Sequence, residues 1–262
     1  MSILEASVEG IGLWGRGLPS WQAAVAFMQS GALTDAAPNR PAPQLLAPNE
    51  RRRAPDTVAV ALEAALSACQ AAGRDPSQLP SVFTSHHGEI AITDYMCAVL
   101  ADDPATLSPT RFHNSVHNAA AGYWTIGAHA HAPATALSAG AYSFAQGLLE
   151  AMVQLATDSQ AVLLVGYDSQ GTGPLAEMTD TRGLLGGALV LARDPKAGAP
   201  RLRLTVHDGP PPATPQGPLS TWGQGNAMAA MLPVFERLAG TGAPVALASG
   251  PAQWLELDVL HG

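Results

Sequence analysis

Apolar residues return along the chain with two different periods, and the two periods alternate. Helical spacing is clearest over residues 57–72, which read TVAVALEAALSACQAA and stop at Gly73. Short apolar runs bounded by turn residues indicate buried strands, as in AVLLVGY at 161–167. Further helices are predicted at 21–28, 89–100, 114–128, 142–156 and 227–238, and further strands at 3–15, 79–85, 134–138, 186–192, 201–207, 245–248 and 254–259. Strands that alternate with helices predict an α/β fold with a buried sheet.

Proline and glycine concentrate in two segments. Residues 35–55 are rich in Pro, Ala, Asn and Arg, and they predict a loop. Residues 208–219 read DGPPPATPQGPL and are the best linker in the chain. This linker divides the chain into a domain over residues 1–207 and a small helix-plus-strands appendage over residues 220–262. We expect the appendage to pack on the same core.

Charge is sparse, and the balance is acidic. Only 13% of the 262 residues are charged and the net charge is −8, which argues against a nucleic-acid-binding protein. The one basic cluster is Arg51, Arg52 and Arg53. We interpret it as a solvated turn rather than a docking site for an acidic carrier protein. A surface this poor in charge also suits a chain that is partly covered by a partner.

The cysteines and the N-terminus point to the cytoplasm. Cys69 and Cys97 lie in apolar helical stretches and are expected to be buried free thiols in a reducing compartment. The first residues have no basic region followed by an apolar one, so no signal peptide is predicted. No apolar run has the length and composition of a membrane span.

Histidines cluster in the middle of the chain. They are His86, His87, His113, His117, His129 and His131. His113 and His117 would share one face of a helix, and His86 or Glu89 could supply a third metal ligand. The spacing is generic, however, and histidines in polar niches are the favoured interpretation. We therefore predict neither a metal nor another cofactor.

A serine hydrolase or acyltransferase is the alternative enzyme class. Ser138 follows a predicted strand and precedes a helix, within a sequence one residue short of the nucleophile-elbow pattern. An acid such as Asp168 or Asp180, followed by His207 or His261, would complete the order of a catalytic triad. The simpler interpretation is a tight turn in which only small residues fit.

A longer motif lies around this turn. Leu107-Ser108-Pro109, Asn118, Gly122, Thr125-Ile126 and Pro133 are similar in spacing, without a gap, to the block that precedes the nucleophile of the β-ketoacyl synthases. The resemblance covers about residues 1–195 and implies a thiolase-like αβα layered fold, truncated to the N-terminal half plus the appendage. The string HNSVHN at 113–118 resembles most the short chain-length-factor subunits of aryl polyene and related pigment pathways.

The departures from the family pattern concern catalysis. Active members carry a cysteine at the strand–helix turn, where a helix N-terminus lowers the pKa of its thiol, but the matching residue here is Ala141. Ser143 matches a family serine, whereas Phe144 replaces the usual glycine and crowds the approach of an acyl chain. The histidine motifs of the family's C-terminal half are absent. The resemblance therefore implies a subunit that is not an enzyme on its own.

Such a subunit is expected to pair with an active β-ketoacyl synthase in fatty-acid-like or aryl polyene biosynthesis, and to meet an acyl carrier protein through that complex. By analogy, residues 134–137 would pair with a strand of the partner. The residues expected to line the interface or the acyl tunnel are Ile92, Met96, Phe112, Tyr123, Trp124, Leu137, Tyr142, Ser143 and Phe144. Filling of the core is the competing role for each of them. A homodimer without a synthase partner is a third class of function.

Overall fold

One mixed sheet of eight strands runs through the protein. The computed structural model describes residues 3–179, 181–240 and 244–261. The strands are β1 (Ile3–Gly15), β2 (Ser81–Thr84), β3 (Ala134–Leu137), β4 (Ala161–Ser169), β5 (Leu184–Ala192), β6 (Arg201–Asp208), β7 (Val245–Gly250) and β8 (Gln253–Leu260). Their order across the sheet is β3-β2-β4-β5-β1-β6-β8-β7. Strands β3, β2 and β4 are parallel, and each later pairing is antiparallel.

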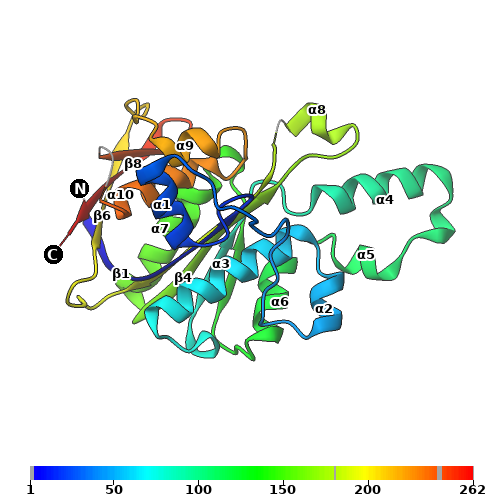
Figure 1. Ribbon diagram of the computed structural model, residues 1–262, viewed down its shortest axis with the longest axis horizontal. Coiled ribbons are helices and arrows are strands. Elements are labelled where there is room, and N and C mark those ends of the chain that lie inside the picture. The colour runs from blue at the N-terminus through cyan, green and yellow to red at the C-terminus, as the bar shows by residue number, and fades with distance from the viewer. Residues whose placement is uncertain (1–2, 180, 241–243, 262) are drawn as a thin grey trace.

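Helices cover both faces of this sheet (Figure 1). They are α1 (Trp21–Ser30), α2 (Pro48–Arg53), α3 (Asp56–Ala72), α4 (Ile90–Asp102), α5 (Pro109–His113), α6 (Ala119–Gly127), α7 (Ser143–Thr157), α8 (Leu175–Thr179), α9 (Pro218–Trp222) and α10 (Leu232–Leu238). Helices α3 and α6 build one apolar core, and α7 and α10 belong to the core on the opposite face. Every residue of β4 is buried, because this strand lies between the two cores.

Helix α3 lies directly on β1, and two glycines allow this close approach. A Cβ atom built on Gly12 would lie 2.0 Å from the backbone oxygen of Ala64, and one built on Gly10 would lie 2.1 Å from that of Ala68. Real side chains cannot tolerate such distances. Glycine is therefore required where the helix backbone touches the strand.

The residues after the Pro/Gly-rich segment extend the same sheet. β8 pairs with β6 along its whole length, and β7 adds the last strand. Leu232, Val234 and Phe235 of α10 are buried in the core that α7 covers. Helix α9 begins at Pro218, inside the predicted linker, because proline suits the first turn of a helix.

Most predicted strands and helices are confirmed to within two or three residues, but three local predictions were wrong and one short helix was missed. Residues 48–53 form helix α2 instead of a loop, with Pro48 at its first position and arginines in its last turn. The helix predicted over 114–128 is split, because α5 ends at His113 and α6 begins at Ala119. The helix predicted from 227 begins at 232, after a 3₁₀ turn over 229–231. The short helix α8 was not predicted.

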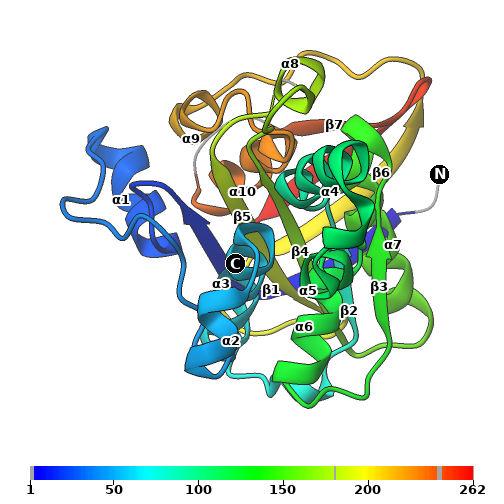
Figure 2. The same ribbon diagram turned by 90° about the vertical axis from the view of Figure 1, so that its right-hand side faces the viewer.

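Helices α4 and α5 form an arm that projects from the body (Figure 1) and points toward the viewer in Figure 2. Ile90 is the only buried residue of α4, and α5 has none. The two helices are tied together where the guanidinium carbon of Arg111 lies 3.9 Å from the centroid of the Tyr95 ring. Cys97 is exposed on this arm, so the prediction of its burial was wrong, whereas Cys69 is buried.

Candidate functional site

The turn between β3 and α7 holds the position that matches the family nucleophile. Gly140 adopts a left-handed backbone conformation, with φ of 58°, at the start of the 3₁₀ turn η3 (Gly140–Tyr142). The Ser143 hydroxyl closes the turn, since it donates to the Gly140 oxygen at 2.7 Å and accepts from the Ala139 amide at 3.0 Å. Ala141 lies exposed on this turn. The turn is therefore well formed, but it presents only a methyl group.

The loop over residues 85–88 lies beside this turn and is fixed by a buried carboxylate. Asp168, at the end of β4, is fully buried and accepts from the Ser85 hydroxyl at 2.8 Å. It also accepts from the backbone amides of His86 at 2.8 Å and His87 at 3.1 Å. The Ser138 hydroxyl donates to the His86 backbone oxygen at 3.0 Å. The ends of three neighbouring strands thus hold one short loop.

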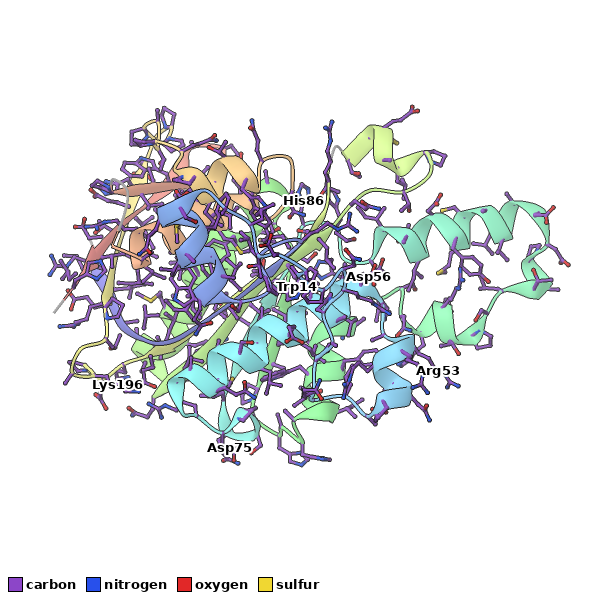
Figure 3. All side chains as sticks on the ribbon, in the orientation of Figure 1. Trp14, Arg53, Asp56, Asp75, His86 and Lys196 are labelled. Atoms are coloured by element: carbon purple, nitrogen blue, oxygen red, sulfur yellow. The ribbon has the colours of Figure 1, made fainter. Side chains whose placement is uncertain are left out.

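This loop presents two stacked imidazole rings. The ring centroids of His86 and His87 are 3.8 Å apart, with planes inclined by 12°. A Cβ atom built on Gly140 would lie 3.8 Å from Nε2 of His86, so this ring faces the strand–helix turn. Figure 3 labels His86 near the middle of the molecule, and α4 of the arm begins shortly after it in the chain, at Ile90. Burial and the neighbouring His86 lower the pKa of His87, which favours its neutral form.

The pKa values of two buried carboxyl groups near the loop are raised. Burial raises the pKa of Asp168, although the hydrogen bonds from His86, Ser85 and His87 oppose this shift. Burial also raises the pKa of Glu89, whose carboxylate accepts from the Thr57 hydroxyl at 2.6 Å. Each carboxyl is occupied with holding backbone or a neighbouring helix. Neither is placed to activate a nucleophile at position 141.

Among the described residues, the geometry assembles no catalytic triad around Ser138; Asp180, the other candidate acid, lies outside them. Its hydroxyl donates to a backbone oxygen rather than to an imidazole. Asp168 accepts backbone amides and a hydroxyl rather than a histidine ring. Nε2 of His207 lies 2.7 Å from Glu256, and the His207 ring stacks on Trp254. Asp168 and His207, two of the groups that a hydrolase could use, are thus engaged elsewhere.

The histidine cluster does not converge either. Nε2 of His117 lies 3.0 Å from the Ser85 backbone oxygen, and Glu89 points to Thr57. Within residues 3–179, 181–240 and 244–261, no three His, Cys, Asp or Glu side chains form a group that could hold a metal ion.

The predicted interface and tunnel residues separate into two groups. Trp124 is 0% exposed and Phe144 is 2% exposed, and Ser143 is also buried; Trp124 packs on Phe83 with ring centroids 6.1 Å apart. These three belong to the interior of this chain. The others reach the surface of the arm, of α6 or of the β3–α7 turn: Ile92, Met96, Tyr123, Leu137 and Tyr142 are half-buried, and Phe112 is 57% exposed.

Two apolar surface residues were missing from the predicted set. Val116 is 48% exposed and Ile126 is 71% exposed, and both line a cavity of 670 Å³ together with Phe112 and Tyr123. The cavity lies between α2, α5 and α6, with Glu50, Asn114 and Asn118 as polar lining. Ile126 stands in an apolar run typical of a core, which gave no sign of its exposure, whereas Val116 stands among polar residues in HNSVHN.

Strand β3 forms an edge of the sheet (Figure 2). The amides of Ser81 and Ser85 donate to the oxygens of Pro133 and Leu137, so odd-numbered residues of β3 direct their backbone groups toward β2. Ala134 and Ala136 therefore direct theirs outward. No hydrogen bond to these outer groups comes from the described part of the chain. Both alanine side chains are also exposed.

The sequence matches a family model described as β-ketoacyl synthase, N-terminal domain, over residues 21–255. The chain therefore belongs to the β-ketoacyl synthase family. The resemblance found in the sequence and the thiolase-like layered fold are both confirmed. None of the proteins with curated functions matches the sequence significantly.

Three solved structures show how far the fold is shared. A complex of the ketosynthase ApeO with its chain length factor ApeC from Xenorhabdus doucetiae contains a chain with TM-score 0.74 and 22% identity, covering 97% of this chain and 99% of that one. The type II polyketide synthase complex AntDE:AntF contains one with TM-score 0.72 and 11% identity, covering 98% and 99%. The ishigamide ketosynthase/chain length factor gives TM-score 0.64 and 16% identity, covering 91% and 74%.

Proposed function

We propose that this chain is a non-catalytic subunit of the chain-length-factor type, which pairs with an active β-ketoacyl synthase. One observation carries the proposal. A strand with a free outer edge leads directly into the nucleophile turn, and the turn itself holds alanine. The chain thus retains a surface for pairing where it lacks the group for chemistry.

The atoms near Ala141 offer no nucleophile for catalysis. A methyl group has no lone pair with which to attack a thioester carbonyl. Ser143 is buried and its hydroxyl is used within the turn, while the Ser138 hydroxyl is bound to a backbone oxygen. The imidazole of His86, which faces the turn, has no thiol there to deprotonate. No neighbouring side chain replaces the missing cysteine.

The pairing surface combines backbone and apolar groups. Ala134 and Ala136 offer two outward donors and two outward acceptors, and small exposed side chains let a second strand approach. Large exposed apolar residues gather on the arm, on α6 and on the segment that joins them, since Leu100, Phe112, Val116 and Ile126 are four of the nine in the described chain. Apolar exposure of this kind marks a protein interface.

If this chain helps to set acyl chain length, the residues that do so would be those of its own surface that face the partner. Leu137 and Tyr142 flank the turn, and Phe112 and Tyr123 line the cavity of 670 Å³. Phe144 lies behind the turn, where its ring edge would be 3.0 Å from a Cβ atom on Gly166. Phe144 would therefore act from the interior, as the wall at the end of a tunnel.

The solved relatives support the kind of partner. They include complexes of a ketosynthase with a chain length factor, and one complex that contains an acyl-carrier protein. For this chain we propose the same class of partner, contact with a carrier protein through the complex, and a role in aryl polyene or similar synthesis in the cytoplasm. Among the described residues, none of the helices is long and apolar enough to cross a bilayer.

Co-expression with the ketosynthases of the same cell tests the proposal. A tagged form of this chain should co-purify with one cysteine-bearing ketosynthase, and the mass of the eluted complex should correspond to equal numbers of the two chains. Condensing activity should require that partner's cysteine. Recovery of a folded chain without any ketosynthase, or condensing activity from this chain alone, would refute the proposal.

A further inference from the structure

The far edge of the sheet is built differently from the β3 edge. Strand β7 is the last strand on that side. Residues 209–217, which read GPPPATPQG and which we call the strap, connect β6 to α9 and reach the outer side of β7 through Thr214.

The Thr214 hydroxyl occupies both backbone groups of one edge residue. It donates to the Ala246 oxygen at 3.0 Å and accepts from the Ala246 amide at 3.1 Å. A neighbouring strand would satisfy the same donor and acceptor, so one side chain takes the place of a paired strand residue. Further along β7, the Gln146 side chain donates to the Ser249 oxygen at 2.5 Å. At Ala246, the Thr214 hydroxyl therefore occupies the backbone groups that a ninth strand would use.

Both ends of the strap are also held. The Gly209 amide donates to the Ala252 oxygen at 2.9 Å, in the turn between β7 and β8. The Gly217 amide donates to the buried carboxylate of Glu236 at 3.1 Å. Glu236 accepts in addition from the Ser220 amide at 2.8 Å, which fixes the start of α9. The strap is thus held along its length against the body of the protein.

The composition of the strap prevents it from becoming a new edge. Residues 210, 211, 212 and 215 are exposed prolines, which have no N–H group to offer to a further strand. A covering segment of ordinary residues would present a new row of donors and acceptors. This segment covers one edge without creating another.

We propose that the strap is an edge guard: the Thr214 hydroxyl closes β7 against pairing with a further strand, first of all the β7 strand of a second copy of this chain. Strand-to-strand assembly is then left to the β3 edge. This proposal does not rest on the proposed function, because it concerns the opposite end of the sheet.

Three substitutions in the full chain test the guard. Thr214→Val keeps the shape but removes the hydroxyl, Thr214→Ser restores a hydroxyl, and Thr157→Val is the matched control. The Thr157 hydroxyl is exposed and bonds only to backbone oxygens of its own helix.

Two measurements are made on each variant, namely hydrogen exchange of the Ala246 amide and sedimentation over a range of concentrations. In Thr214→Val we expect this amide to exchange about fivefold faster or more, as loss of one hydrogen bond implies. We also expect a rise in mass with concentration beyond that of the wild type, while Thr214→Ser and Thr157→Val behave like the wild type. An Ala246 amide that exchanges equally in wild type and Thr214→Val would overturn the proposal, as would faster exchange without any added association.

Discussion

Ala136→Pro should weaken pairing of β3 with a partner strand while leaving the folding of this chain intact. Ala136 lies in β3 and directs its amide away from β2, as the alternation of hydrogen bonds along the strand requires. Proline removes that amide hydrogen and places a ring on the outer edge, but it removes no bond to β2. It also favours an extended conformation at Thr135, which that residue already has as part of β3. The chain should therefore fold with the substitution.

The size of the effect follows from the groups that are lost. A partner strand can form up to four hydrogen bonds with Ala134 and Ala136, each worth about 1 kcal/mol net. Ala136→Pro removes one of them and leaves a partner carbonyl buried without a donor, which costs about 1–3 kcal/mol more. The total of about 2–4 kcal/mol corresponds to pairing that is weaker by between about 30-fold and about 1,000-fold.

The assay is titration of the purified ketosynthase partner with this chain, with Ala136→Ser as the control that keeps the amide hydrogen. Ala136→Ser should bind like the wild type, and both variants should unfold at the denaturant midpoint of the wild type within experimental error. If Ala136→Pro bound the partner with unchanged affinity while folded, strand pairing at β3 would not hold the complex together, and the argument from the free edge would be wrong.

Three further predictions concern the turn, the buried carboxyl group and the contact between helix and strand. Ala141→Cys, made together with Cys97→Ser to remove the other exposed thiol, should be alkylated rapidly yet give no condensing activity alone; activity would contradict a non-catalytic site. Burial raises the pKa of Asp168 above its unfolded value, so folding favours the protonated group and stability falls as pH rises from about 4 through the folded pKa. In denaturant titrations at a series of pH values, Asp168→Asn should remove this fall of the unfolding free energy with pH. At pH 7 the substitution should cost about 1–3 kcal/mol of stability, because hydrogen bonds are lost. If the unfolding free energy of the variant depended on pH as in the wild type, the assignment to Asp168 would be refuted. Gly12→Ala should destabilise the chain by about 3 kcal/mol or more in thermal unfolding, whereas Gly122→Ala, where a Cβ atom meets nothing within 4 Å, should be neutral or slightly stabilising.

The periodicity of apolar residues was sufficient to predict the central strands and helices. Residues 161–167 are buried, and most of residues 57–72 are buried too, so local pattern and tertiary environment agree there. The pattern failed where short helices depend on their ends. Helix α2 is a single charged turn without an apolar stripe, and proline and helix-dipole effects decide it instead.

In the candidate site, too, the sequence pattern predicted some features and missed others. The sequence placed Ala141 on a strand–helix turn, because the strand before it and the helix after it both have clear patterns. The pattern could not separate Trp124 from Phe112, since both stand in segments with few charges. The fold buries the first completely and leaves the second 57% exposed on the arm.

The sequence by itself determined the alternation of strands and helices, the family, and the absence of a cysteine at position 141. It did not determine which edge of the sheet is open, because ATAL at 134–137 and VALA at 245–248 have the same apolar character. Only the tertiary structure distinguishes them. Thr214, distant along the chain, hydrogen-bonds both backbone groups of Ala246 in the second segment, while nothing in the described chain reaches the outer groups of the first. Edge accessibility is a property of what packs alongside a strand, and the strand's own residues do not encode it.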